Sequence, residues 1–165
     1  MEHSKGIIRH RLMLALEDLT HPDQLLVTRA LKLAEEVHAR QYRRPLKIDP
    51  LLKIAYINHP MRVALILIEE MQQKNPDLIA AALLHDVVED SNGKVTTAML
   101  EQEFGRTVAL MVSVLTKPPV DKKIPRAKQL ETYHERVVNA NSQTRLIKLC
   151  DRTDNMREAL EAEDE

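Results

Sequence analysis

Apolar residues recur every three or four positions along most of this 165-residue chain. That period is typical of amphipathic helices, and only the stretch 42–58, which holds Pro45 and Pro50, lacks it. We interpret 42–58 as a long loop and find no credible strand pattern anywhere. The pattern therefore predicts an all-α helical bundle. Its expected helices span, in order, 7–19, 26–41, 60–73, 76–90, 97–104, 106–115, 126–140 and 143–162.

Length and composition indicate one domain over 1–165, whose C-terminus is either clipped or belongs to a minimal form. The single cysteine, Cys150, excludes an intrachain disulfide and favours a reducing compartment, so we expect a cytoplasmic protein. Cys150 lies in an apolar stripe and is predicted to be a small buried hydrophobe rather than a nucleophile. The charged N-terminus and the lack of any apolar run of about 18 residues give no sign of a signal peptide or membrane span.

The net charge of −1 says little about partners, but its distribution is informative. Basic residues gather in 40–62 and in 117–128, on either side of an acidic cluster, while 158–165 is acidic. Such an arrangement fits a small polyanionic ligand bridged to a metal ion. The alternative is a pair of solvated basic loops. The apolar helix over 7–19 packs either within the chain or against a second copy in a homo-oligomer.

The acidic cluster is the strongest chemical signal. His85 and Glu89 are four residues apart, as are Asp86 and Asp90, so each pair lies on one strip of a helix. The apolar residues just before them predict burial, and buried acids need a neutralising partner such as a divalent cation. Adjacent helical residues point about 100° apart, so His85 and Asp86 can both bind one ion only near a bend.

Two further candidate ligands, His59 before Pro60 and Asp151, would complete a set of two imidazoles and two carboxylates. This set suits Mn²⁺, Fe²⁺ or Zn²⁺ in a hydrolytic role better than a structural zinc ion. Each residue also has an ordinary explanation. His85 alone is a typical core histidine, His59 a helix cap, and Asp151 an ion-pair partner for Lys148 or Arg152. Taken together, the set favours a metal site.

Glu89 and Asp90 lie one turn from His85 and are candidates for proton transfer to or from metal-bound water, whose pKa the ion would lower towards neutrality. Their alternative is a solvent-exposed acidic turn, which the helix dipole disfavours. Asn155 follows Asp151 by four residues on the same helical face and can donate to a ligand oxygen; otherwise it is a polar surface residue.

Several motifs over 30–157 resemble the HD-domain phosphohydrolases, and more narrowly the hydrolase domain of the RelA/SpoT alarmone family, including its small single-domain members. In chain order they read His38-Ala-Arg-Gln-Tyr-Arg-Arg44, Tyr56-Ile-Asn-His-Pro60, Ala81-Ala-Leu-Leu-His-Asp-Val-Val-Glu-Asp90, Phe104-Gly105, Leu115-Thr-Lys117, Ile147-Lys-Leu-Cys-Asp-Arg152 and Asn155-Met156.

The resemblance implies a helical fold that holds Mn²⁺, or another divalent transition metal, through His59, His85, Asp86 and Asp151. It further implies that Glu89 and Asp90 serve the attacking water. The substrate-binding residues that it implies are Arg43, Arg44, Lys117 and Asn155. The implied reaction removes pyrophosphate from the 3′ position of guanosine tetra- or pentaphosphate, (p)ppGpp. The expected partner is thus a small phosphorylated nucleotide rather than a nucleic acid or a membrane.

Three positions differ from the family pattern. The segment 45–55 is longer and lacks glycine, the segment after Lys117 is rich in proline and basic residues, and Glu158 replaces a small hydroxyl residue. Two alternatives follow: an HD phosphohydrolase that acts on another phosphorylated nucleotide or dinucleotide, or a non-catalytic nucleotide-binding module. The second would have no need of Glu89 and Asp90.

Overall fold

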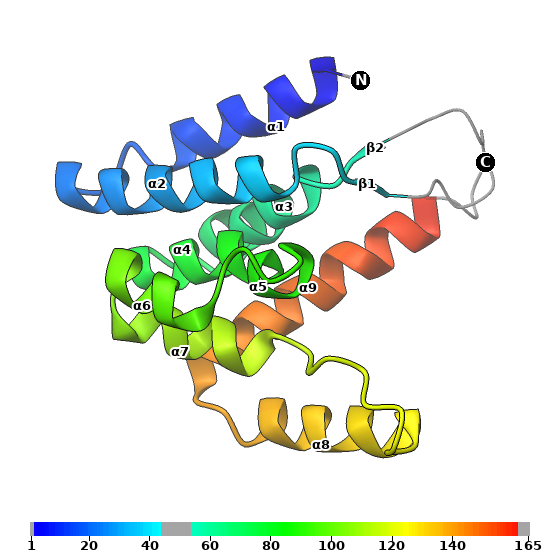
Figure 1. Ribbon diagram of the computed structural model, residues 1–165. Helices are drawn as coiled ribbons and strands as arrows, with labels where there is room; N and C mark the ends of the chain where they lie inside the picture. Colours follow the sequence, from blue (N-terminus) through cyan, green and yellow to red (C-terminus); the bar gives the residue numbers. More distant parts are fainter. Residues whose placement is uncertain (1, 44–53, 162–165) are drawn as a thin grey trace.

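The computed structural model describes residues 2–43 and 54–161, and Figure 1 shows them as a helical bundle. The elements, in chain order, are α1 (Glu2–Ala15), α2 (His21–Val37), β1 (Tyr42–Arg43), β2 (Ile54–Ala55), α3 (Asn58–Leu65), a π-helical turn η1 (Ile66–Glu70), α4 (Pro76–Leu84), α5 (Val87–Asp90), α6 (Thr97–Phe104), α7 (Arg106–Leu115), α8 (Arg126–Val138) and α9 (Ser142–Glu161). The predicted all-α bundle is confirmed.

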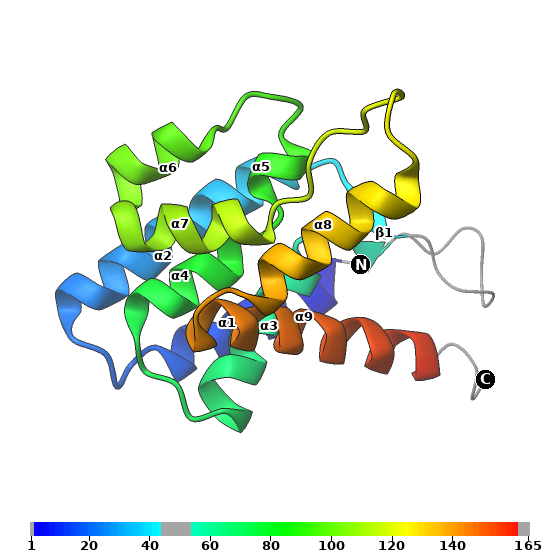
Figure 2. The same cartoon turned by 90° about the horizontal axis from the view of Figure 1, so that it is seen from below.

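Helix α4 forms the centre of the core. Every residue from Leu78 to Leu84 is at most 1% exposed, and the helix contacts α2, α3, α7 and α9 (Figures 1 and 2). A helix that is buried on all sides must be apolar all round, as this one is. Its start is well defined, because the Asn75 side chain accepts hydrogen bonds from the backbone N–H groups of Asp77 and Leu78, with Pro76 in the first turn.

The predicted continuous helix over 76–90 is wrong, because α4 ends at Leu84 and α5 begins at Val87. Asp86, between them, has φ −103° and ψ −6°, in the sparsely populated bridge region where many active-site residues lie. Periodicity alone does not reveal the break, since the apolar positions continue through it. The bend that two neighbouring metal ligands require is therefore present at His85–Asp86.

The prediction that no strand occurs is wrong for one short ladder. Tyr42 pairs with Ala55, and Arg43 pairs with Ile54, in antiparallel register. Two residues are too few for an alternating apolar pattern to show. The intervening 44–53, with Arg44 and most of the predicted loop, lie outside the described residues.

Of the two N-terminal helices, α2 packs along α4 and α1 packs on α3. The predicted first helix, 7–19, is found as Glu2–Ala15, and it packs within the chain against α3, with Leu12 and Leu16 fully buried. The predicted helix over 60–73 is found as α3 and η1, where the Met71 N–H donates to the carbonyl of Ile66 in a π-type turn.

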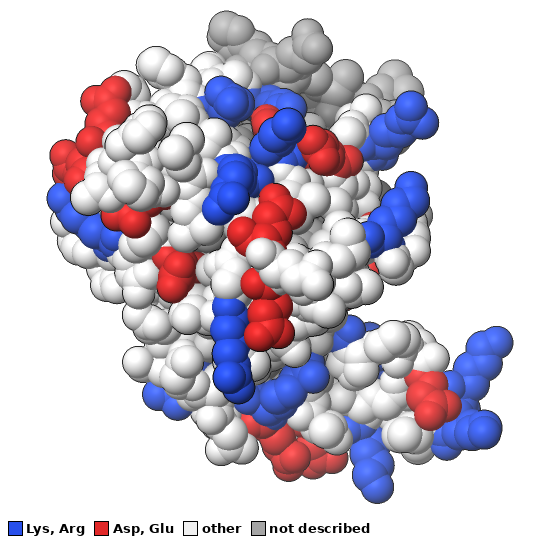
Figure 3. Space-filling view, turned by 60° about the vertical axis from the view of Figure 1, so that its left-hand side comes forward, with Lys and Arg blue, Asp and Glu red and all other residues white. Residues whose placement is uncertain are grey.

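Helix α9 crosses the body of the molecule and contacts α3, α4, α7 and α8 (Figure 2). Its Cys150 is fully buried, and burial raises the pKa of the thiol to about 11, in keeping with a structural role. Helix α8 and the loop before it project from the body and carry basic side chains (Figure 3). No helix in the described part of the chain combines the length and apolarity needed to cross a membrane.

Candidate metal centre and catalytic site

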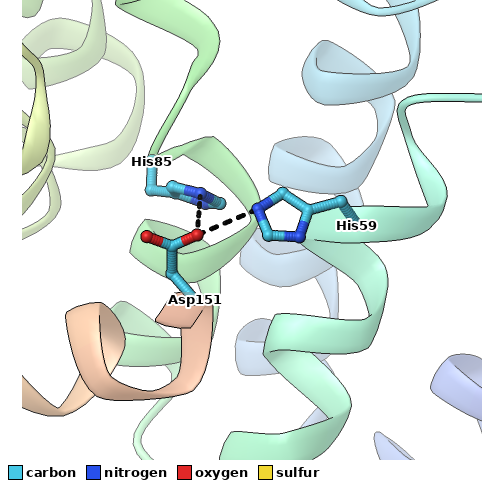
Figure 4. A group of neighbouring side chains, drawn as sticks. All are labelled: His59, His85 and Asp151. Carbon is cyan, nitrogen blue, oxygen red and sulfur yellow. Dashed lines mark ion pairs between the residues drawn. The ribbon is translucent and has the colours of Figure 1, made fainter. Parts of the chain in front are cut away.

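Three helices bring the four predicted metal ligands together. His59 comes from α3, His85 from the end of α4 and Asp151 from α9 (Figure 4). The ligand atoms of these three lie within 4.8 Å of one another, with His59 Nε2 3.1 Å and His85 Nε2 3.9 Å from Asp151 Oδ1. Asp86 Oδ2 lies 3.1 Å from His85 Nε2 and 3.9 Å from His59 Nε2. Residues far apart in sequence thus form one cluster.

Hydrogen bonds orient both imidazoles so that Nε2 faces the carboxylates. His59 Nδ1 donates to Asp154 Oδ2 at 2.6 Å, and His85 Nδ1 donates to the carbonyl of Ala82 at 2.8 Å. Because these acceptors are oxygen atoms, the protons on Nδ1 are fixed and Nε2 is left to bind a ligand. His85 Nε2 is buried and has no hydrogen-bond partner. This orphaned nitrogen, together with the mixed imidazole–carboxylate set, fits a divalent transition metal.

The electrostatics of the cluster match a site for a cation. Burial alone would raise the pKa of Asp151, but His59, His85 and Lys148 outweigh it and hold that pKa well below its usual range. Asp86 behaves in the same way: burial is outweighed by His85 and by a hydrogen bond from Tyr56, so its pKa is also lowered. Burial opposes the charge on His85, yet Asp86 and Asp151 raise its pKa to about 9, so a metal ion would bind Nε2 in place of the proton that these carboxylates favour there. Both carboxylates are therefore ionised and attract positive charge.

The predicted acid/base pair lies on α5, next to this cluster. Burial, followed by the negative charges of Asp86 and Glu89, raises the pKa of Asp90 to about 6. A carboxyl group with such a pKa can both accept and release a proton near neutral pH. The Glu89 side chain is more exposed, and its carboxylate accepts hydrogen bonds from the Lys117 backbone N–H at 3.2 Å and from Lys117 Nζ at 3.1 Å.

Among the residues predicted to bind substrate, Arg43 and Asn155 border the cluster directly. Asn155 Nδ2 donates to Asp151 Oδ1 at 2.6 Å, while Asn155 Oδ1 accepts from Arg43 Nη2 at 2.9 Å. Arg43 is thereby connected to a predicted metal ligand through one amide. Lys117 lies farther along, at Glu89. Arg44 lies outside the described residues.

Sequence reasoning missed three residues of the surrounding shell. Tyr56 O–H donates to Asp86 Oδ2 at 2.6 Å, and Asp154 fixes His59. His38, which the sequence marks only as the start of one motif, is fully buried, and its Nδ1 lies 3.8 Å from Asp90 Oδ2. Asp154 follows Asp151 by three residues on α9, a spacing that could have placed it on the same face. No local signal connects Tyr56 to Asp86. Lys148, weighed as a partner of Asp151, does pair with it, at 2.7 Å.

Comparison with known proteins adds independent evidence. The family model described as HD domain matches residues 30–165. The guanosine-3′,5′-bis(diphosphate) 3′-pyrophosphohydrolase of Xenopus tropicalis is 35% identical over 136 residues, which cover 82% of this chain and 70% of the relative. The Danio rerio enzyme of the same name is 37% identical over 128 residues, covering 78% and 66%. The chain thus spans about two thirds of the length of these relatives.

A solved structure has the same fold. It is described as a metazoan ortholog of SpoT that hydrolyzes ppGpp and plays a role in starvation responses. It superposes with a TM-score of 0.68 and 29% sequence identity, over 81% of this chain and 69% of that one.

Proposed function

This chain belongs to the HD-domain family, and from that premise we propose that it is a metal-dependent hydrolase that releases pyrophosphate from the 3′ position of (p)ppGpp. The observation that carries the proposal is the convergence of His59, His85, Asp86 and Asp151 beside Asp90, whose pKa is about 6. The proposed substrate is that of the similar guanosine-3′,5′-bis(diphosphate) 3′-pyrophosphohydrolases, and the proposed metal ligands and proton-transfer groups support its hydrolysis.

In this proposal His59, His85, Asp86 and Asp151 hold one Mn²⁺ ion, for which two imidazoles and two carboxylates are a suitable set. When bound, the ion supplies positive charge that lowers the pKa of water and stabilises negative charge on a phosphoryl group. Asp154 and the Ala82 carbonyl keep the two imidazoles in the binding orientation. A reducing compartment such as the cytoplasm fits the single buried cysteine.

The proton-transfer groups are Asp90 and Glu89. Asp90 is poised to take the proton of the attacking water, because its pKa of about 6 leaves it largely ionised at neutral pH yet basic enough to accept. Lys117 Nζ pairs with Glu89 at 3.1 Å and, being partly exposed, can also contact a phosphate oxygen. Arg43, Arg44 and Asn155 hold the remaining phosphates, where bidentate guanidinium contacts are most effective.

The test is incubation of the purified Mn²⁺-loaded protein with a panel of phosphorylated nucleotides, with each product identified. We expect (p)ppGpp to give pyrophosphate and the guanosine 5′-polyphosphate. Asp151→Ala should abolish both metal binding and turnover, whereas Glu89→Ala should keep the metal and slow turnover by roughly 10²–10⁴-fold. Asp18→Asn, an exposed carboxylate paired with Lys74, is the matched control.

The outcomes separate the alternatives. Cleavage of another nucleotide, with (p)ppGpp left intact, would replace the proposed substrate by a different one. Binding of nucleotides without any turnover would indicate a non-catalytic module. Full activity in both Asp151→Ala and Glu89→Ala would show that the chemistry takes place elsewhere.

A further inference from the structure

Arg43, which we propose as a phosphate-binding residue, already has an anionic partner within the chain. Arg43 Nη1 donates to Glu158 Oε2, and Arg43 Nη2 donates to Asn155 Oδ1 at 2.9 Å. The guanidinium also stacks over the Tyr56 ring, 5.3 Å from its centroid. These contacts leave the Arg43 side chain only 15% exposed. The carboxylate of Glu158 thus occupies one edge of the group that would hold a phosphate.

We propose that Glu158 acts as an internal competitor for phosphate groups on Arg43. A phosphate of the substrate, or the pyrophosphate product, can accept hydrogen bonds from this edge of the Arg43 guanidinium only by displacing the Glu158 carboxylate. Glu158 therefore lowers the affinity of the Arg43 subsite and helps to expel the product. The inference rests on the proposed function, because it concerns the phosphate subsite of that same reaction.

The contacts indicate that Glu158, rather than Asn155, is the group that gives way. Asn155 Nδ2 is tied to both the side chain and the backbone carbonyl of Asp151. Among the described residues, the one other partner of Glu158 is Arg62 Nη2, at 3.5 Å, and Arg62 already donates two shorter hydrogen bonds to Asp154. The Glu158 side chain is 21% exposed, so solvent can reach it. Among the described residues, Arg43 is therefore the main partner that keeps the Glu158 carboxylate in place.

The structure also offers the displaced carboxylate a place to go. Glu158 lines a cavity of about 210 Å³ between α1, β2, α3, η1 and α9. Arg11, Arg62 and Arg157 line the same cavity. Arg11 pairs with Glu69, and Arg157 pairs with Glu70. The carboxylates of Glu69, Glu70 and Asp154 line the cavity too, so it offers the displaced carboxylate room and the neighbouring Arg62 guanidinium, without a net positive charge.

Charge decides the direction of the exchange. A diphosphate carries more negative charge than one carboxylate and offers more acceptor oxygens for a guanidinium. It can therefore replace Glu158, but part of its binding free energy is used to break the existing pair. Partly buried ion pairs of this kind contribute on the order of 1 kcal/mol, which corresponds to about fivefold in affinity. Removal of the Glu158 charge should therefore make the binding free energy of the diphosphate more favourable by about that amount.

The experiment measures binding of inorganic pyrophosphate by calorimetry to the Mn²⁺-loaded protein after free metal has been removed. Glu158→Gln keeps the size of the side chain and removes its charge, and we expect the Kd of pyrophosphate to fall roughly three- to tenfold. Where (p)ppGpp is turned over, its KM should fall by a similar factor. Glu69→Gln removes a carboxylate from the other side of the same cavity and should change the Kd less than twofold.

A double-mutant cycle shows whether the effect passes through Arg43. In the Arg43→Gln background, Glu158→Gln should change pyrophosphate binding less than twofold. Unchanged or weaker binding in Glu158→Gln overturns the inference, as does an equal gain in the Arg43→Gln background or in Glu69→Gln. Since calorimetry needs no turnover, a protein that fails to cleave (p)ppGpp but shows the Arg43-dependent gain would refute the proposed function and support the competition.

Discussion

Asp154 offers the sharpest test of the metal centre, because it contacts a proposed ligand without being one. Its carboxylate is buried, 3% exposed, and accepts from His59 Nδ1 at 2.6 Å. It also accepts from Arg62 Nε at 2.6 Å and from Arg62 Nη2 at 3.0 Å. Burial is outweighed by these hydrogen bonds, which keep the pKa of Asp154 low and its charge intact. The perturbation is Asp154→Asn.

The magnitude follows from the number of acceptors. Asparagine has one oxygen where aspartate has two. Its amide NH₂ must therefore face either Arg62 Nε, or His59 Nδ1 together with Arg62 Nη2, so at least one donor loses its acceptor. Loss of such an outer partner typically weakens metal binding by about 10- to 100-fold, or about 1.4–2.8 kcal/mol. We also expect the free energy of unfolding to fall by about 2 kcal/mol, because charge-assisted hydrogen bonds are lost.

The assay titrates metal-free protein with Mn²⁺ and follows the free ion by electron paramagnetic resonance. Glu70→Gln is the control, because its exposed carboxylate pairs with Arg157 away from the histidines. Circular dichroism and a thermal melt establish that each variant is folded. A folded Asp154→Asn protein that binds Mn²⁺ within twofold of the wild type would refute the role that we give to the His59–Asp154 hydrogen bond.

Three further predictions use other parts of the structure. Burial in the folded state favours the neutral form of the Asp90 carboxyl group. Its contribution to the free energy of unfolding is therefore fully present below pH 3.8 and is lost as the pH rises through about 6. Relative to Asp90→Asn, the wild type should therefore lose about 1 kcal/mol across this range in urea unfolding, and a constant difference would count against the raised pKa. Tyr56→Phe removes the hydrogen bond to Asp86 and should weaken Mn²⁺ binding about tenfold; unaltered binding in the same resonance titration would contradict this. Leu83→Ala empties part of the α4 core and should cost 2–5 kcal/mol in chemical unfolding, a loss below 1 kcal/mol being inconsistent with full burial.

The residues that sequence reasoning found are those whose type conflicts with their surroundings. His85 and Asp86 directly follow a run that is buried to the last residue, and such a pair needs a chemical reason. Helices α6 and α7 have the bounds that the sequence predicts, because apolar periodicity defines their length and Gly105 marks the boundary between them. Gly105 has φ 86°, a conformation that few other residues adopt, and it separates the two helices.

The residues that it missed owe their place to tertiary contacts. Tyr56 follows a two-residue strand pair and contacts Asp86, 30 residues away, so neither period nor composition could connect them. The sequence marks Glu158 only as a departure from the family pattern, and its pairing with Arg43 spans 115 positions. Local pattern specifies which helices form, whereas the partners of a side chain depend on how those helices pack.

The break between α4 and α5 shows how the two levels combine. A continuous helix would point His85 and Asp86 about 100° apart, and would carry Asp90 onward along the same axis. In the structure the bridge-region backbone at Asp86 brings its carboxylate to within 3.1 Å of His85 Nε2. The chain then resumes as α5, whose last residue is anchored where Gln41 Nε2 donates to the Asp90 carbonyl at 3.1 Å. The irregular backbone therefore lets two adjacent proposed ligands face the same point, which the 100° step between neighbours in a regular helix disfavours, while α5 keeps Asp90, the proposed proton-transfer group, next to Asp86.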